Sequence, residues 1–224
     1  DKARQRRQGS FVSRSKANAP ARTAAGEGAY HAANALPPNG METHMAHNPQ
    51  TITLGGGCFW CTEAVFDRVR GITDVESGYT NGHTINPSYE QICQGDTGHA
   101  EVVRLTFDAD EISLEEILEI FFHTHDPTTL NRQGNDVGTQ YRSGIYYDNP
   151  EHGEIANAMI RQMSQDKLFS APITTEVAPL SNYSTAEAYH QDYFANHPHA
   201  GYCAFVVGPK VEKFRKTFAR YLKD

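Results

Sequence analysis

Cysteine is scarce in this chain, and its scarcity excludes one class of protein. The 224 residues include four cysteines, Cys58, Cys61, Cys93 and Cys203, at uneven intervals. These are too few for a secreted domain of this size that is held together by disulfides. We therefore expect redox or catalytic cysteines in a reducing compartment such as the cytoplasm.

Long apolar runs and an excess of positive charge are missing as well. No stretch approaches the roughly 18 apolar residues that span a bilayer, and no hydrophobic core of a signal peptide is visible. The formal net charge is −7, although seven of the 20 Lys and Arg residues lie before residue 41. The rest of the chain is therefore strongly acidic, which argues against nucleic-acid binding.

The first 50 residues have few large apolar side chains and neither helical nor strand periodicity. This composition predicts a disordered or extended N-terminal segment, residues 1–50, followed by one catalytic domain, residues 51–224. An organelle transit sequence and an extension upstream of a native start at Met41 or Met45 both fit the segment.

The glycine-rich stretch Gly55 to Cys58 follows the β-branched run 51–54 and precedes an expected helix that ends at Gly71. A strand, a glycine turn and a helix start would place Cys58 near free backbone N–H groups and the positive end of the helix dipole. This environment lowers a cysteine pKa and predicts a thiolate nucleophile. The alternative is a small buried apolar residue at a packed junction. Phe59 and Trp60 favour an apolar wall beside a reactive sulfur.

The clearest strand covers residues 99–107, where Val103, Leu105 and Phe107 share one face. Glu101 has the same parity. A carboxyl that points inward is desolvated, so its pKa rises and it can serve as a general acid near neutral pH. The alternative is a solvated carboxylate at a strand end.

The remaining patterns predict an α/β or α+β class, with helices packed on a sheet. We expect strands at 72–79, 142–148 and 173–179, and helices at 86–95, 113–122, 150–167, 185–196 and from Pro209 onward. The helix at 185–196 should bury Tyr189, Tyr193 and Phe194, and Cys93 should be a buried bystander. The irregular polar segment 126–141 is of the kind that carries function.

Three motifs in this order resemble the A-type peptide-methionine sulfoxide reductases. They are Gly57-Cys58-Phe59-Trp60, the run from Gly95 through Gly98-His99-Ala100 to Glu101, and Gln133-Gly134-Asn135-Asp136 leading into Gly138-Thr139-Gln140-Tyr141-Arg142-Ser143. The resemblance implies a two-layer sandwich of a mixed sheet and helices with a ferredoxin-like core. It also implies a monomer that reduces methionine (S)-sulfoxide, free or in proteins, with thioredoxin as reductant and with no metal and no bound cofactor.

The resemblance also assigns roles to individual residues. Cys58 would attack the sulfoxide sulfur and Glu101 would protonate its oxygen, while Phe59 and Trp60 would enclose the substrate methyl. Tyr89 and Tyr141 would donate hydrogen bonds to the oxygen, and Asp136 would order them. Without the resemblance, these last three residues read as ordinary half-buried tyrosines and a turn-forming aspartate.

Two thiols are candidates to resolve the sulfenic acid on Cys58. The resemblance favours Cys203, in Gly-Tyr-Cys, whereas the i, i+3 spacing puts Cys61 on the same side of the first helical turn as Cys58. We expect Cys203, with Cys61 as the alternative. Two other functions stay open: a thioredoxin-like dithiol oxidoreductase built on Cys58-x-x-Cys61, and a zinc-binding module. The zinc module would use Cys203, His190, His197 and His199, whose spacing matches no structural zinc signature.

Overall fold

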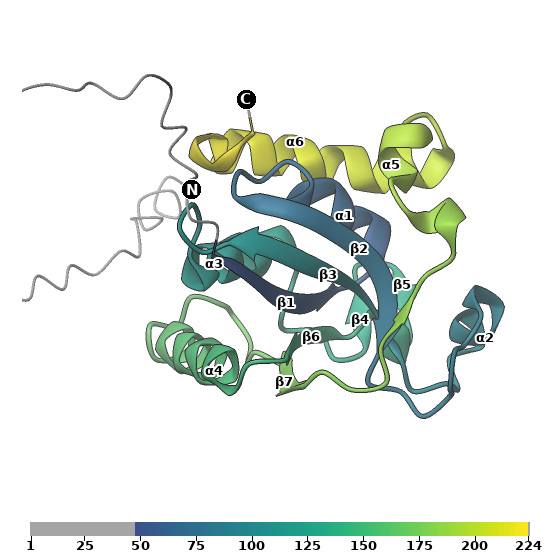
Figure 1. Cartoon of the computed structure of the whole chain (residues 1–224), viewed down its shortest axis with the longest axis horizontal. Helices are drawn as coiled ribbons and strands as arrows, with labels where there is room; N and C mark the ends of the chain where they lie inside the picture. The colour runs from purple at the N-terminus through teal and green to yellow at the C-terminus, as the bar shows by residue number, and fades with distance from the viewer. Residues whose placement is uncertain (1–47, 224) are drawn as a thin grey trace, which may run out of the picture. The chain divides into compact units, whose positions relative to one another are not determined.

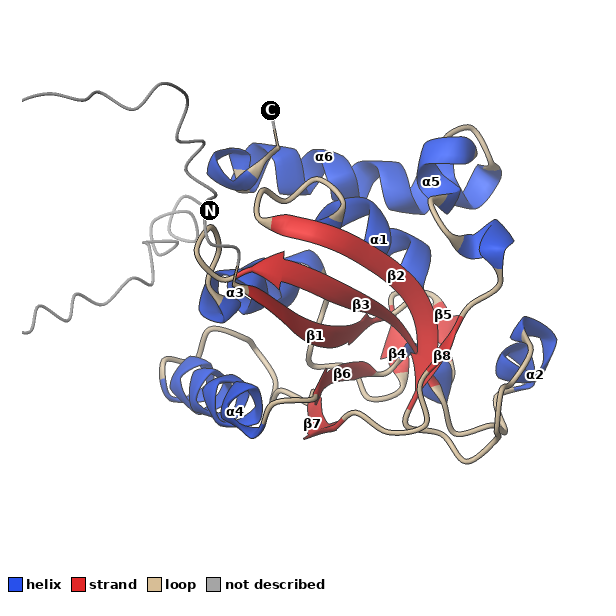
Figure 2. Cartoon of the chain, viewed as in Figure 1, coloured by secondary structure: helices blue, strands red, loops and turns tan. Residues whose placement is uncertain are grey.

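A computed structural model describes residues 48–223 of the chain, so almost all of the predicted N-terminal segment, residues 1–50, lies outside the described residues. Six strands form one mixed sheet in the order β7-β6-β1-β3-β2-β8, and β4 pairs with β5 in a separate hairpin (Figure 2). The strands are β1 (Pro49–Gly56), β2 (Ile72–Thr80), β3 (Ala100–Asp108), β4 (Arg132–Gln133), β5 (Asp136–Val137), β6 (Ser143–Tyr147), β7 (Glu176–Pro179) and β8 (Ser184–Thr185).

The helices are α1 (Phe59–Phe66), α2 (Tyr89–Gln94), α3 (Leu114–Thr124), α4 (Pro150–Gln165), α5 (Tyr193–Asn196) and α6 (Gly208–Thr217). The ferredoxin-like β-α-β-β-α-β unit consists of β1, α1, β2, β3, α3 and β6. Its four strands lie antiparallel in the order β6-β1-β3-β2. Strand β7 extends the sheet in parallel beside β6. The expected fold class is confirmed.

Helices α1 and α3 cover one face of the sheet, so the described part of the chain has two layers (Figure 1). Inward side chains of alternate strand residues, such as Leu54, Val103 and Leu105, meet apolar residues of α1 and α3 in one continuous core. On the other face, a small cluster of Ala100, Val102 and Tyr146 is covered by the chain segment that follows β7. The active-site candidates lie on the helical side, where apolar packing excludes water.

Capping residues mark the start of α2 and of α3. Ser113 accepts a hydrogen bond from the Glu116 N–H at 3.2 Å, and the Glu116 carboxylate accepts one from the Ser113 N–H at 3.0 Å. This capping box satisfies backbone groups at the start of α3. A second box at Ser88 starts α2, which ends at Gly95 in the left-handed conformation with φ +80°.

The predicted helix at 185–196 is wrong. The segment instead contains β8, a 3₁₀ turn at Ala188–His190, and the single turn α5. The segment is held against β2, because the Ala186 N–H donates to the Ser77 carbonyl at 2.9 Å. The side-chain amide of Gln191 also donates to and accepts from the Ser77 backbone, at 3.0 and 2.9 Å. Asp192 then adopts a left-handed φ of +55°, which interrupts a helix. Tyr189 is 55% exposed rather than buried.

Helix α1 also ends earlier than predicted, at Phe66 rather than near Gly71. The C-terminal end of the chain takes the hydrogen bonds that would have continued the helix. Arg70 donates its N–H to the Tyr221 carbonyl at 2.7 Å, and Val69 pairs with Leu222 in an antiparallel bridge. Within residues 48–223, no helix combines the length and apolar character needed to cross a bilayer.

Candidate active site

Gly57 places Cys58 at the junction of β1 and α1. Strand β1 ends at Gly56, and Cys58 is the N-cap of the helix. Gly57 has a φ of +94°, and a Cβ on it would lie 2.6 Å from the side chain of Gln133. A residue other than glycine would therefore be strained and would displace the loop that Gln133 anchors. Gln133 itself accepts from and donates to the backbone of Asp126, each at 3.0 Å.

Glu101 points from β3 into the core beside Cys58, as its strand parity predicted. It is 2% exposed and accepts a hydrogen bond from the Phe59 N–H at 3.1 Å. Burial raises the pKa of Glu101 to about 8, although the Phe59 N–H opposes the rise; the charges of Asp136 and Cys61 add to it. The carboxyl is therefore mostly protonated at neutral pH and can donate a proton.

The prediction of a lowered pKa for Cys58 is wrong. The thiol is 7% exposed. Burial raises its pKa well above the usual value, and the hydrogen bond with Cys61 and the charge of Glu101 raise it further. The N–H of Trp60 acts in the opposite direction, but it is outweighed. A helix N-terminus stabilises a thiolate only where the loss of water is small, and this one is buried.

Cys61 shares the first turn of α1 with Cys58. Its N–H donates to the Cys58 carbonyl at 3.1 Å, an i to i+3 bond of the 3₁₀ type that nearly aligns the two side chains. The two thiols are hydrogen-bonded to each other, and this bond lowers the pKa of Cys61 to about 7 despite burial; Lys210 and Tyr202 lower it further. Cys61 therefore ionises before Cys58.

The other two cysteines differ from each other in exposure. Cys203 is 0% exposed, at the start of a π-helical stretch, Cys203–Val207, that leads into α6. Burial and the neighbouring Cys61 raise its pKa. Cys93 is exposed, so the prediction that it is buried is wrong. It lies on the outer side of α2, and its thiol is hydrogen-bonded to Tyr89.

Aromatic rings surround the two residues that follow Cys58. Phe59 is 1% exposed, and its ring centroid lies 5.8 Å from that of Tyr79. Trp60 stacks on Tyr193 at 3.9 Å and donates its indole N–H to Nδ1 of His190 at 3.2 Å. The site thus has a rigid apolar wall beside Cys58.

Tyr89 and Tyr141 approach Glu101 from two different segments. Tyr89 is the first residue of α2, and Tyr141 ends a 3₁₀ turn, Thr139–Tyr141. Burial raises the pKa of both phenols, and the charge of Glu101 raises it further. Both hydroxyls stay protonated and can donate hydrogen bonds. The charge of Asp136 acts on both Tyr141 and Glu101, so the predicted site residues converge on one place.

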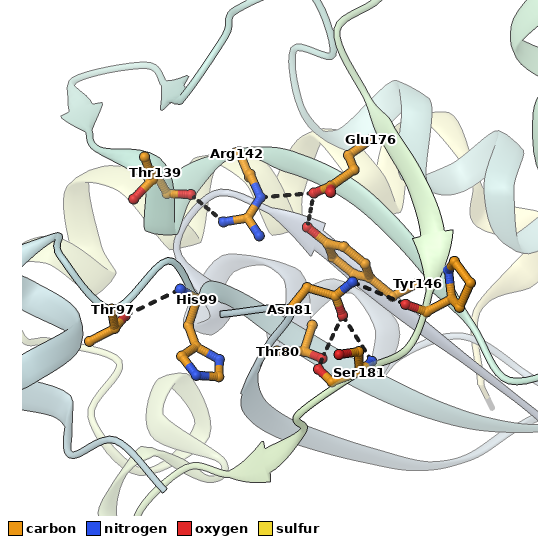
Figure 3. Close-up of polar contacts among 10 residues, drawn as sticks. Thr80, Asn81, Thr97, His99, Thr139, Arg142, Tyr146, Glu176 and Ser181 are labelled. Carbon is orange, nitrogen blue, oxygen red and sulfur yellow. Dashed lines mark hydrogen bonds and ion pairs between the residues drawn. The ribbon is translucent and has the colours of Figure 1, made fainter. Parts of the chain in front are cut away.

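Arg142 anchors the turn that carries Tyr141 (Figure 3). It donates to the Thr139 carbonyl at 3.0 Å and to the Glu176 carboxylate at 2.9 Å. The same carboxylate accepts from the Tyr146 hydroxyl at 2.9 Å. These bonds connect the turn to β6 and β7, so the position of Tyr141 depends on the sheet.

Sequence reasoning missed several residues that contact the predicted site. Tyr202 donates to Asp136 at 2.6 Å and hydrogen-bonds Cys61. Glu187 accepts from the Tyr89 N–H and from the Tyr79 hydroxyl, each at 2.8 Å. Lys210 hydrogen-bonds Cys61. Tyr202 could have been found from its position directly before Cys203. Glu187 and Lys210 could not, because their contacts are long-range and leave no local pattern in the sequence.

The zinc module suggested by the histidines finds no support in the structure. Among the side chains of residues 48–223, no three His, Cys, Asp or Glu residues form a group that could hold a metal ion. Within this part of the chain, His190 instead accepts the indole hydrogen bond of Trp60.

Comparison with known proteins agrees with this arrangement. The family model described as peptide methionine sulfoxide reductase matches residues 50–222. The chain is 56% identical over 178 residues to MsrA of Ralstonia nicotianae, covering 78% of this chain and 93% of the relative. It is 54% identical over 174 residues to MsrA of Saccharolobus solfataricus, covering 78% and 97%.

A solved structure shows the same fold. The reduced form of Mxr1 from Saccharomyces cerevisiae superposes with a TM-score of 0.64 at 35% identity, over 71% of this chain and 91% of that one. The family match covers the segment that carries Cys58 and Glu101. The chain therefore belongs to the peptide methionine sulfoxide reductase family.

Proposed function

We propose that this chain reduces methionine (S)-sulfoxide, free or in proteins, with Cys58 as the nucleophile and Glu101 as the acid. The observation that carries the proposal is the hydrogen bond from the Phe59 N–H to the buried Glu101 carboxyl. This bond holds the acid next to Cys58, the N-cap residue of α1. The family assignment supports the reaction class.

In the first step, the sulfur of Cys58 attacks the sulfoxide sulfur while the sulfoxide oxygen receives a proton from Glu101. The oxygen then passes to Cys58 as a sulfenic acid, and methionine leaves. The thiol proton of Cys58 returns to Glu101, so the net change is a thiol and a sulfoxide converted to a sulfenic acid and a thioether. Proton transfer of this kind contributes about 10²–10⁴-fold in rate.

The raised pKa of Cys58 fits this order of events. A neutral thiol next to a protonated Glu101 avoids two buried negative charges. When the sulfoxide binds, its oxygen takes a proton from Glu101, and the carboxylate formed can then take the thiol proton. The nucleophile is therefore generated only with substrate present, which protects it from other oxidants.

The aromatic wall and the two phenols bind the two ends of the sulfoxide group. Phe59 and Trp60 offer the apolar surface that a methyl group needs. Tyr89 and Tyr141 donate to the sulfoxide oxygen, and Asp136 holds the arrangement through Tyr202. When the methyl and the oxygen are held in these two places, the S and R epimers direct the rest of the methionine chain differently, and only one of them fits the opening of the site.

For the second step, we propose Cys61 as the resolving thiol and retain Cys203 as the alternative. Support comes from the contact between the Cys58 and Cys61 thiols and from the lowered pKa of Cys61. Cys203 is buried, and burial and the charge of Cys61 raise its pKa, which makes it the weaker candidate. We propose thioredoxin as the reductant, from the family resemblance.

The proposal also concerns the chain as a whole. We propose residues 51–224 as the catalytic domain, which the family match from residue 50 supports. We propose the cytoplasm as the compartment, because the reaction starts from a reduced Cys58.

The test uses separate sulfoxide epimers with wild type, Cys58→Ser and Cys61→Ser. Wild type is expected to form methionine from the S epimer alone, and Cys58→Ser from neither. Mass spectrometry after one turnover is expected to show a Cys58–Cys61 disulfide; a Cys58–Cys203 disulfide would assign resolution to Cys203. Rapid insulin-disulfide reduction without sulfoxide reduction would instead support the dithiol oxidoreductase function.

A further inference from the structure

A second polar cluster surrounds Cys61, separate from the residues proposed to hold the sulfoxide. A small cavity of about 10 Å³ has room for about one water molecule. Its lining includes Cys61, Thr62, His125 and Lys210, but none of Cys58, Glu101, Tyr89 and Tyr141. The mechanism proposed above gives this cavity no role.

Lys210 reaches Cys61 from a different element. It follows Pro209 in the first turn of α6 and is half-buried, while α6 packs on α1, as Figure 1 shows. The Lys210 ammonium hydrogen-bonds the Cys61 sulfur. An ammonium group beside a thiol favours the thiolate, because the charges attract and because the N–H donates to the anion.

Lys210 is the cation among the titratable groups around Cys61. His125 lines the same cavity, but its ring nitrogens contact the Phe121 carbonyl and the Ser143 hydroxyl, each at 2.7 Å. Burial lowers the pKa of His125 to about 4, so it is neutral. The titratable groups that face Cys61 from all packed elements are Cys58, Glu101, His125, Tyr202, Cys203 and Lys210. All except Lys210 are neutral or acidic.

We propose that Lys210 is a positioning residue that holds Cys61 as a thiolate directed at Cys58, so that resolution of the sulfenic acid depends on α6. This inference rests on the proposed function and on Cys61 as the resolver. The Cys61 thiolate attacks the Cys58 sulfur, the sulfur–oxygen bond breaks, and the oxygen leaves as hydroxide. The proton that Cys61 lost to solvent returns to make water, and Lys210 keeps its charge.

Removal of Lys210 is expected to shift the pH dependence of disulfide formation and to lower its rate only moderately. If the Cys61 pKa rises from about 7 toward the ordinary value near 8.5, the thiolate fraction at pH 7 falls more than tenfold. A more basic thiolate is intrinsically a better nucleophile, which offsets part of this loss. We expect disulfide formation at pH 7 to slow about three- to fivefold and its pH midpoint to rise by about 1.5 units.

The experiment follows one turnover without external reductant, using the full chain and one equivalent of methionine (S)-sulfoxide. Samples quenched at successive times are analysed for methionine, for dimedone-trapped sulfenic acid and for the disulfide, between pH 5.5 and 9.5. Lys210→Met removes the charge and keeps the length, and Lys210→Arg restores the charge. Lys213→Met is the matched control, because Lys213 is an exposed lysine on the same helix.

In Lys210→Met, sulfenic acid should accumulate and the midpoint of disulfide formation should rise, while Lys210→Arg and Lys213→Met follow wild type. An unchanged midpoint in Lys210→Met would overturn the inference, as would an equal shift in Lys213→Met. Circular dichroism checks folding; if Lys210→Met is unfolded, Lys210→Gln replaces it under the same criteria. Absence of methionine in wild type would refute the proposed function instead, so the two failures are distinguishable.

Discussion

Replacement of Glu101 by glutamine tests the proton donor directly. Glu101→Gln keeps an oxygen that can accept from the Phe59 N–H, at 3.1 Å in the wild type, and it keeps the size of the side chain. It can donate a hydrogen bond to the sulfoxide oxygen but cannot transfer a proton at neutral pH. The first chemical step is therefore expected to slow by about 10²–10⁴-fold.

The pH profile supplies the sharper part of this prediction. With the Glu101 pKa raised to about 8, about nine-tenths of the carboxyl is protonated at pH 7 and about one-tenth at pH 9. The rate of methionine formation should therefore fall roughly tenfold per pH unit above about pH 9, with a midpoint near 8. Glu101→Gln should lose this midpoint.

A built-in optical probe makes the measurement direct. The chain has one tryptophan, Trp60, two residues from Cys58, so stopped-flow fluorescence reports on the site during a single turnover. Quenched samples provide the amount of methionine. Glu76→Gln is the matched control, because Glu76 lies on the adjacent strand β2 opposite Arg104 and bonds Tyr183 at 2.6 Å, away from the cysteine. A loss below tenfold in Glu101→Gln, or a retained midpoint near pH 8, would refute the role.

Three further predictions concern the framework of the site. Gly57→Ala should destabilise the fold more than Gly134→Ala in urea unfolding: both glycines have positive φ, but only at Gly57 does the new Cβ meet another side chain, at 2.6 Å. Equal losses would contradict the steric argument. Glu63→Ala removes the acceptor of two N–H groups at the start of α5, so the free energy of unfolding should fall by about 1–3 kcal/mol for each; a loss under 1 kcal/mol would contradict this. Tyr202→Phe removes the 2.6 Å bond to Asp136, and kcat/KM for the sulfoxide should fall about tenfold. A change under twofold would contradict the proposal that Asp136 orders the site through Tyr202.

Much of the fold follows from local patterns. Strand alternation placed β3 and the inward orientation of Glu101, and capping signals at Ser113 located the start of α3. These succeed because the forces involved act between residues that are close in sequence. The helix expected at 185–196 failed for the opposite reason, since the Ser77 backbone, which is distant in sequence, pairs with the Ala186 N–H and with the Gln191 side chain.

The electrostatics of the site show where sequence reasoning stops. A cysteine after a glycine turn predicts a thiolate, and the position of Cys58 at the helix start is as expected. The direction of its pKa shift depends on how much water the folded chain removes, and that depends on packing from all sides. The same limit applies to Lys210, whose proximity to Cys61 depends on the docking of α6 and has no local signature.

The shared helical turn of Cys58 and Cys61 has a consequence for the redox cycle. A crosslink between them would close a ring of only four residues, which by the chain-entropy relation stabilises a fold by about 2 kcal/mol, whereas closing most of the domain through Cys203 would give about 5 kcal/mol. The oxidised and reduced forms therefore differ less in stability with the smaller ring than they would with the larger one. A reductant that regenerates the enzyme would then have to offset only the smaller stabilisation of the fold by the disulfide.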